Sequence, residues 1–327
     1  MNYSIGIFFC AVSVFFAYML IRMKNRRRGK FDIHGAKLDY DALIWHAGQL
    51  AKNQELELGK ASIKSLVGDV SNNYRHILET YRRLSRFAEN GKSITGADEW
   101  LLDNFYIIEE QAKELLQTIQ SQSIGKLPVI VEGQYSGYPR VFAIAVELVN
   151  YTDSSITEKS LIDFINEYQK TSYLTDSELW SLSSMLKIAL MENIRHICDG
   201  INKTHNQYEQ AEAASEEIFL KKQRLDEALG QFFKNNPIDN SSLIEHLVAL
   251  FKKHGCDGGE GLHYIDIRLS RISTSTDKII SAEHQKQAAR QVSMGNAITS
   301  LKFVLSLDYT EAFEDRKSTR LNSSHGK

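Results

Sequence analysis

The fold is decided by residues 97–151, which contain two amphipathic segments in succession. The first segment reads ADEWLLDNFYIIEEQAKELLQTIQ (Ala97–Gln120), and the second reads GYPRVFAIAVELVNY (Gly137–Tyr151). Apolar residues in the first recur every three or four positions, which places them on one face of a helix: Leu101, Phe105, Ile108, Ala112, Leu115 and Ile119. The second has Pro139 at a helix start, followed by its own apolar face: Val141, Ile144, Ala145 and Leu148. The stretch therefore predicts two packed helices.

Helix-start signals recur along the chain. A serine or threonine three positions before an acidic residue is the pattern of a capping box. Four predicted helix starts carry it: Thr95 with Asp98, Ser155 with Glu158, Thr175 with Glu178, and Ser242 with Glu245. The chain has only three prolines, which favours long helices. We predict an all-α fold, since Val129–Val131 is too short to indicate a sheet.

Further helices are predicted from the periodicity on both sides of the opening stretch. They cover residues 38–58, 62–89 (ending before Asn90-Gly91), 155–169, 175–197, 242–253 and 265–307. Residues 203–224 are polar and contain no helix breaker, so we expect a solvent-exposed extension or coiled connection. The glycine-rich sequence HGCDGGEG, residues 254–261, predicts a loop.

The predicted core draws on several of these helices. We expect ten residues to be buried together: Trp100, Phe105, Ile108, Leu115, Val141, Ile144, Leu148, Leu182, Leu186 and Leu190.

Composition is that of an ordinary folded protein. The 327 residues carry a formal net charge of −2, with 43% hydrophobic and 24% charged residues. There is no basic excess of the kind that nucleic-acid-binding domains show, so no nucleic-acid partner is expected. The three cysteines (Cys10, Cys198 and Cys256) are far apart and predict no disulfide framework.

The N-terminal residues predict a membrane anchor. Ile5–Ile21 reads IGIFFCAVSVFFAYMLI without a charge, and six lysine or arginine residues follow between positions 22 and 30. This length approaches a membrane span, and the basic flank is expected to stay in the cytoplasm and to touch lipid headgroups. A cleaved signal peptide would carry its charges before the apolar run. We therefore expect a single-pass protein of the cytoplasmic (inner) membrane with most of the chain in the cytosol.

The predicted domain organisation follows from these segments. Residues 1–30 form the transmembrane anchor with its basic flank, 31–95 a helical connector, and 96–315 a helical domain. Residues 316–327, RKSTRLNSSHGK, break from the preceding composition and are expected to be a non-native tail. On this interpretation the natural chain continues past Glu314; the alternative is an ordinary disordered C-terminus.

Two groups of residues resemble metal sites. Asp39-Tyr40-Asp41 matches the DxD pattern with which sugar-nucleotide transferases hold a divalent cation. It opens a helix rather than following a strand, so capping and first-turn acidity explain it better. His254, Cys256 and His263 could approach a zinc ion, but their spacing matches no standard ligand pattern.

Two further groups contain the residue types of a catalytic site or an anion site. Glu109 and Glu110 are adjacent on a helix and therefore point in different directions, so a solvated face or a salt bridge explains them better than acid–base chemistry. Arg140, near Tyr138, could bind an anion at a helix start, with structural packing as the default. We assign no catalytic, cofactor-binding or metal residue.

Five motifs, taken in order, carry a resemblance to a known family. They are WLLDNFYIIEEQ from Trp100, GYPR from Gly137, LTDSELW from Leu174, ENIR from Glu192, and EHQKQAA from Glu283 with SMGNAITSLKFVLSLDYTEAFE after it. Together they resemble the N-terminal region of bacterial cyclic β-1,2-glucan synthases, of the glycosyltransferase family 84 type with a cellobiose-phosphorylase-like C-terminal part. The resemblance covers residues 97–314.

The resemblance implies a function for the parent protein more than for this chain. In that family the region is helical and cytosolic, and it precedes a membrane-embedded glucosyltransferase domain that uses UDP-glucose with a divalent metal. Later domains cyclise the glucan and trim it by phosphorolysis. The downstream glucosyltransferase and phosphorylase-like domains of the same polypeptide are thus the implied partners. The family's metal-binding aspartates and QxxRW-type motif have no credible match here, and its primer attachment site cannot be placed on any tyrosine.

Two functions stay open. One is a non-catalytic, membrane-anchored helical region of an enzyme that makes cyclic β-1,2-glucan, inactive by itself and without a cofactor of its own. The other is a free-standing membrane-anchored helical adaptor or scaffold. The sequence downstream of Glu314 would distinguish them.

Overall fold

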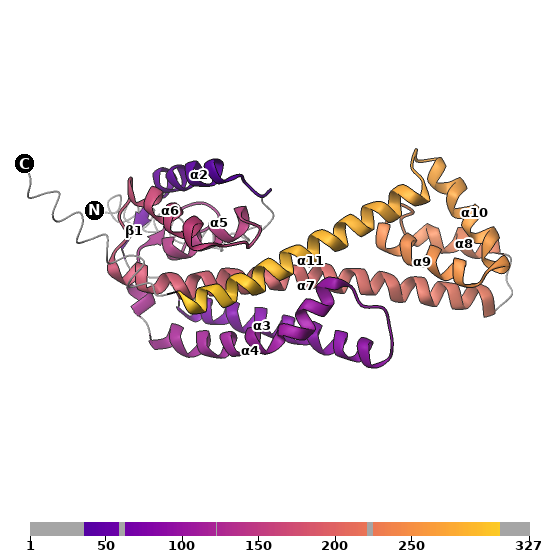
Figure 1. Cartoon of the computed structure of the whole chain (residues 1–327), viewed down its shortest axis with the longest axis horizontal. Coiled ribbons are helices and arrows are strands. Elements are labelled where there is room, and N and C mark those ends of the chain that lie inside the picture. The colour runs from indigo at the N-terminus through magenta and orange to yellow at the C-terminus, as the bar shows by residue number, and fades with distance from the viewer. Residues whose placement is uncertain (1–35, 59–62, 122, 221–224, 308–327) are drawn as a thin grey trace, which may run out of the picture. The chain divides into compact units, whose positions relative to one another are not determined.

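The structure is a computed structural model that describes residues 36–58, 63–121, 123–220 and 225–307. Within these ranges it contains ten α-helices, one short 3-10 helix (η1, Ser123–Lys126) and one pair of two-residue strands (Figure 1). The predicted all-α fold is confirmed. The predicted anchor Ile5–Ile21 and the tail Arg316–Lys327 lie outside the described residues. None of the described helices is both long enough and apolar enough to cross a membrane.

The chain folds as two compact units. Unit 1 comprises the described residues up to Asn73, Glu109–Asn193, and those from Thr299 onward. Unit 2 comprises Tyr74–Ile108 and Ile194–Ile298. The predicted domain boundaries at residues 30, 95 and 315 stay a prediction.

Unit 1 contains two packed helices and a small strand pair. Helix α2 (Tyr40–Asn53) lies beside α6 (Glu158–Gln169), as Figure 1 shows. Strand β1 (Leu56–Glu57) pairs antiparallel with β2 (Val129–Ile130). The helix predicted to reach residue 58 therefore ends at Asn53, because the backbone turns extended at Gln54 and the chain enters β1.

Helix α5 (Arg140–Tyr151) lies at the centre of unit 1. Its residues from Arg140 to Val149 are all buried, so it is covered on every side. The turn before it contains Gly137 at φ +81°, and Pro139 is its N-cap residue. A helix buried all round must pair the charges it carries, and α5 carries two, at Arg140 and Glu147.

Helices α3 (Ile63–Glu89) and α4 (Gly96–Ser121) begin and end close to where the sequence predicted. Helix α3 ends in a Schellman motif around Gly91, whose φ is +66°. The Lys92 N–H donates to the Phe87 carbonyl at 2.9 Å, and the Gly91 N–H donates to the Ala88 carbonyl at 3.1 Å. The predicted stop at Asn90-Gly91 is confirmed.

Helix α7 (Asp176–Leu220) is 45 residues long and includes most of the polar stretch that begins at Lys203. The predicted solvent-exposed extension is wrong over these residues. Seven side chains here are buried: Thr204, His205, Tyr208, Ala211, Ala214, Ser215 and Ile218. The sequence suggests a solvated stretch because glutamate, lysine and glutamine dominate its other face, while its buried face combines small, aromatic and hydroxyl residues with Ile218.

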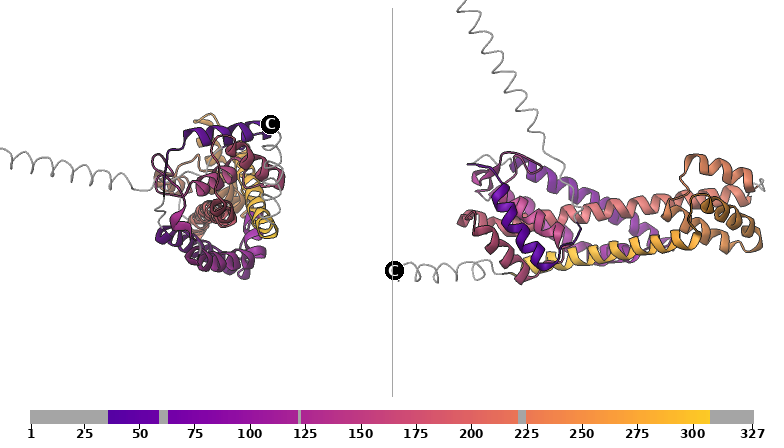
Figure 2. Two further views of the ribbon diagram at one scale, coloured as in Figure 1. Left: turned by 90° about the vertical axis from the view of Figure 1, so that its left-hand side faces the viewer. Right: turned by 90° about the horizontal axis from the view of Figure 1, so that it is seen from above.

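The last four helices belong mainly to unit 2. They are α8 (Leu225–Asn235), α9 (Ser241–Lys253), α10 (Cys256–Ser270) and α11 (Thr276–Ser306). Figures 1 and 2 show α8, α9 and α10 gathered beside the C-terminal end of α7. They share one apolar cluster with α7 and α11: Ala211, Ile218, Leu229, Phe233, Leu243, Ile244, Leu247, Val248, Phe251, Ile265, Leu269 and Ile279.

The glycine-rich residues 254–261 are not a loop, contrary to the prediction. Gly255, at φ +63°, separates α9 from α10, and α10 begins at the next residue. A side chain at Gly261 would place its Cβ 2.6 Å from the ring of Phe251. This glycine therefore lets α10 pack closely on α9. The region predicted from Ile265 to Leu307 is divided by a turn in which Ser273 has φ +59°.

The four predicted capping boxes have different outcomes. Thr175 and Glu178 form theirs, since the Thr175 N–H donates to Glu178 Oε2 at 2.8 Å and the Glu178 N–H donates to Thr175 Oγ1 at 3.4 Å. At Thr95 the backbone N–H donates to Asp98 Oδ2 at 2.6 Å. The other two predictions are wrong. Helix α6 is capped by Thr157 with Ser160 rather than Ser155 with Glu158, and α9 by Asn240 rather than Ser242. Nearby hydroxyl and amide side chains compete for the cap.

Nine of the ten predicted core residues are buried, and Trp100 is partly exposed. They belong to two cores, with Phe105 and Ile108 in unit 2 and Leu115 through Leu190 in unit 1.

Candidate functional site

The arginine of the GYPR motif forms a buried ion pair in unit 1. Arg140 Nε donates to Glu178 Oε1 at 2.5 Å, and its Nη2 donates to Glu178 Oε2 at 2.8 Å. The remaining donors reach Ser172 Oγ and the Tyr173 carbonyl. Burial lowers the pKa of Arg140, but Glu178 more than offsets this, so the pKa is raised. The anion that Arg140 binds is thus a carboxylate of its own chain, which confirms the packing interpretation.

A second buried carboxylate, Glu147 of α5, has three hydrogen-bond partners. His46 Nε2 of α2 lies 2.6 Å from Glu147 Oε2. Tyr135 Oη donates to Glu147 Oε1 at 2.5 Å, and Gln134 Nε2 donates to the same oxygen at 3.3 Å. Burial, and then the charge of Glu147, raise the pKa of Tyr135, so this phenol stays a donor. The arrangement fastens α2 and the 134–135 turn to the central helix.

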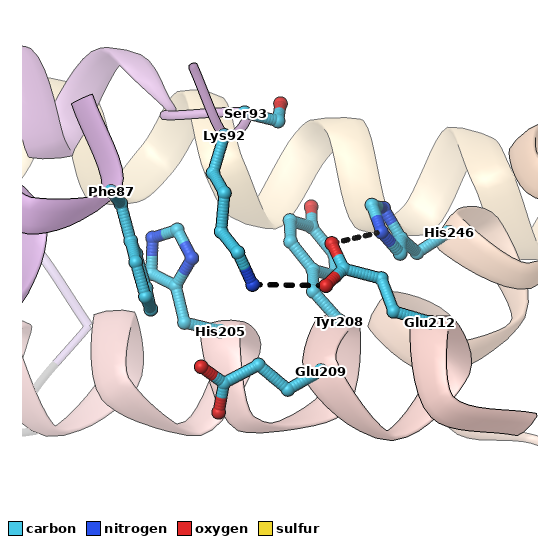
Figure 3. A pocket seen from close by; sticks show the side chains of 8 residues that line it. All are labelled: Phe87, Lys92, Ser93, His205, Tyr208, Glu209, Glu212 and His246. Atoms are coloured by element: carbon cyan, nitrogen blue, oxygen red, sulfur yellow. Dashed lines mark hydrogen bonds and ion pairs between the residues drawn. The ribbon is translucent and has the colours of Figure 1, made fainter. Parts of the chain in front are cut away.

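Unit 2 contains a small polar pocket, drawn in Figure 3. Side chains from α7, α9 and the end of α3 line it: Phe87, Lys92, Ser93, His205, Tyr208, Glu209, Glu212 and His246. Glu212 lies between two cationic or basic groups. Its Oε2 is 3.0 Å from Lys92 Nζ and its Oε1 is 3.5 Å from His246 Nε2, the two dashed lines of Figure 3.

The two histidines of the pocket differ in their partners. His205 Nε2 lies 2.9 Å from Asp98 Oδ2, and both side chains are almost fully buried. His246 stacks on the ring of Tyr208 with centroids 4.2 Å apart. Burial lowers the pKa of His246, although the neighbouring Glu212 raises it. We therefore expect His246 to be neutral at pH 7.

The pocket is too small for a sugar or a nucleotide. Its volume is about 10 Å³, close to the least that holds one water molecule. Pockets that bind small organic ligands measure roughly 300–1,000 Å³. The arrangement joins α3, α4, α7 and α9 by ion pairs and ring contacts, and it is best explained as a structural polar cluster.

None of the candidate residues from the sequence is among those that line this pocket. Asp39 is the N-cap of α2, where its Oδ1 accepts from the Ala42 N–H at 2.9 Å, and Asp41 lies in the first turn. The capping interpretation of the DxD pattern is confirmed. Glu109 pairs with Lys113 at 3.1 Å, one turn along α4, as the salt-bridge interpretation predicted.

The residues considered for zinc have a different environment. His254 stacks on Phe219, with ring centroids 3.9 Å apart. The side chain of Cys256 lies outside the described part of the structure. Among the described residues, no group of three or more histidine, cysteine, aspartate or glutamate side chains could hold a metal ion.

Sequence reasoning missed the buried partners. Glu147, His46, Asp98 as a partner of His205, and Tyr208 were not singled out as polar core residues. The pairs His46–Glu147 and Asp98–His205 join residues more than 100 positions apart, so a single sequence carries no sign of them. A charged residue inside an apolar run, such as Glu147 in VFAIAVELV, was the available signal.

Comparison with known proteins finds a similarity to a glucan synthase. No family model matches the chain. Over 249 residues, or 74% of its length, the chain is 28% identical to cyclic β-(1,2)-glucan synthase NdvB of Rhizobium meliloti (strain 1021). The matched residues span 8% of that much longer protein. The resemblance to a region of such a synthase, predicted from the five ordered motifs, is confirmed.

Proposed function

We propose that this chain is a non-catalytic helical region of an enzyme that synthesises cyclic β-1,2-glucan from UDP-glucose. The observation that carries the proposal is the similarity to NdvB over 249 residues. Because the match takes in only 8% of that protein, most of its length is available for the catalytic domains. The transferase activity of those domains, their UDP-glucose substrate and their divalent metal are part of the proposal.

The chemistry of the buried groups supports a structural role. Glycosyl transfer from a nucleotide sugar needs a site for the diphosphate and a base for the acceptor hydroxyl. The buried charges here are engaged within the chain: Arg140 with Glu178, Glu147 with His46, and Asp98 with His205. Groups held in this way stabilise a scaffold and have little capacity left for a substrate.

The proposed partners are the glucosyltransferase and phosphorylase-like domains of the same polypeptide. Exposed aromatic residues are candidates for such contacts, because large apolar groups at a surface are often covered by another domain. Trp45, Trp180 and Tyr173 of unit 1 are 66%, 65% and 71% exposed. We further propose that Ile5–Ile21 anchors the region at the membrane, on the strength of its charge order.

The test of the non-catalytic role is an assay of the purified chain with radiolabelled UDP-glucose and Mg²⁺ or Mn²⁺. The assay uses membranes that contain no other glucan synthase. We expect no label in protein or glucan. Label that appears with the wild-type chain and disappears in an Asp39→Asn/Asp41→Asn variant would contradict the proposal. This variant is a suitable control because asparagine also caps helices, so the fold should be kept.

A further inference from the structure

Three helices of unit 2 meet at a buried polar junction. Glu283 of α11 is fully buried, and its Oε2 accepts from Ser241 Oγ of α9 at 2.7 Å. Its Oε1 accepts from Gln287 Nε2 at 3.3 Å. The same amide nitrogen donates to Tyr208 Oη of α7 at 2.9 Å. The junction thus connects α7, α9 and α11 beside their shared apolar cluster.

Glu245 of α9 brings a second carboxyl group to this junction. Its Oε2 is buried and has no hydrogen-bond partner within the described ranges. A buried oxygen without a partner is costly when it carries charge and much less so as a carboxylic acid. Burial first, and then the charge of Glu283, raise the pKa of Glu245, whereas His284 and a hydrogen bond with Tyr208 lower it.

We infer that Glu245 binds a proton when α9 is packed on α7 and α11, and that its ionisation loosens this packing. In the protonated form Glu245 adds no second negative charge to the junction. In the ionised form Glu245 and Glu283 repel each other in a place that little water reaches. The effect is on the stability of unit 2 and does not depend on the proposed function.

The other charged or titratable groups around Glu245 come from the same three helices. Helix α7 contributes Tyr208, whose pKa is raised by burial and then by Glu245 and Glu283. Helix α11 contributes Glu283, His284 and Lys286, and Lys286 Nζ donates to Ser241 Oγ at 2.7 Å. The adjacent His246 faces Glu212.

The sign of the pH effect follows from linkage. Between the ordinary value of 4.5 and the raised pKa, the folded state binds more protons at Glu245 than the unfolded state. Stability from this residue is therefore lost as pH rises, by at most about tenfold in the unfolding constant per pH unit. His246 acts in the opposite direction, because its pKa is lowered. Its contribution is lost as pH falls below its ordinary value of 6.5.

The experiment measures urea unfolding of the full chain between pH 4.5 and 8. It compares wild type, Glu245→Gln, His246→Gln and, as an exposed control in the same unit, Glu260→Gln. We expect the ratio of wild-type to Glu245→Gln unfolding constants to grow with pH above 4.5. The loss of stability with rising pH should be clearer in His246→Gln, because the opposing effect of His246 is absent there. Glu260→Gln should follow wild type. A ratio that stays constant across the range would overturn the inference.

A second measurement covers the case in which Glu245→Gln does not fold. Chain labelled with ¹³C at the glutamate carboxyl carbons is titrated by NMR, in wild type and in Glu283→Gln. We expect one carboxyl group to titrate above the usual glutamate range, and to do so at lower pH once the charge of Glu283 is removed. If every carboxyl titrates in the usual range, Glu245 is not the proton site.

Discussion

At the scale of single residues, this protein depends on buried charges that are paired within the chain. Removing one partner of such a pair leaves a charge without compensation in a place that water does not reach. Arg140 and Glu178 are the clearest case, since their side chains are 5% and 0% exposed. Glu178 also caps α7 through Thr175, so one side chain serves two purposes.

Glu178→Ala should therefore cost about 3–5 kcal/mol in the free energy of unfolding, measured by urea titration. The matched control is Glu109→Ala, which removes a surface pair with Lys113 and should cost no more than about 0.5 kcal/mol. A cost of Glu178→Ala as small as that of the control would show that Arg140 does not need its partner. Replacing Arg140 and Glu178 together by methionine should recover much of the loss.

Aromatic packing is the second residue-scale test. Phe105 is 7% exposed and stacks on Tyr81 with ring centroids 4.0 Å apart. Phe105→Ala should cost about 3–5 kcal/mol. The neighbouring Tyr106 is 64% exposed, and Tyr106→Ala should change stability by about 0.5 kcal/mol or less. Equal effects of the two substitutions would mean that Phe105 is not packed as described.

At the scale of elements, glycines inside helices have a packing role. Gly261 and Gly259 both lie in α10, but only Gly261 faces a neighbour within 4 Å, the ring of Phe251. Gly261→Ala should destabilise the chain by about 1–3 kcal/mol through overpacking. Gly259→Ala should be neutral or stabilising by up to about 1 kcal/mol, because alanine favours a helix. Thermal unfolding of the two variants checks this, and a stabilising Gly261→Ala would contradict the close approach of α9 and α10.

The helices themselves were largely predictable because local signals decide them. The apolar periodicity of Leu101 through Ile119 predicted α4, and Gly91 marked the end of α3, where a left-handed residue closes a Schellman motif. Predictions from the sequence were wrong where tertiary contacts override local preference. The glycines after His254 indicated a loop, but those beyond Gly255 lie in α10, where Gly261 packs closely on Phe251.

The polar clusters were beyond prediction for a related reason. His46 and Glu147 lie in separate helices, and so do Asp98 and His205. Each residue alone has the signature of a solvated or capping side chain. Only the packing of the helices brings the partners together, and one sequence does not contain that arrangement.

At the scale of the whole molecule, each helical unit pairs buried charges within itself: Arg140 with Glu178 in unit 1, and Asp98 with His205 in unit 2. The similarity to NdvB covers 8% of that much longer protein. If other domains rest on this region, its removal would expose apolar surface on those domains and impair glucan synthesis without removing any catalytic residue. We therefore propose that the region is necessary for synthesis but does not perform it.

The most direct measurement is glucan synthesis from radiolabelled UDP-glucose by membranes that contain NdvB in three forms. The forms are intact NdvB, NdvB lacking the residues that match this chain, and NdvB with those residues replaced by the matching part of this chain. We predict that the deletion abolishes or strongly reduces cyclic glucan while the protein still reaches the membrane, and that the replacement restores a measurable part. Undiminished synthesis by the deletion form would contradict the account.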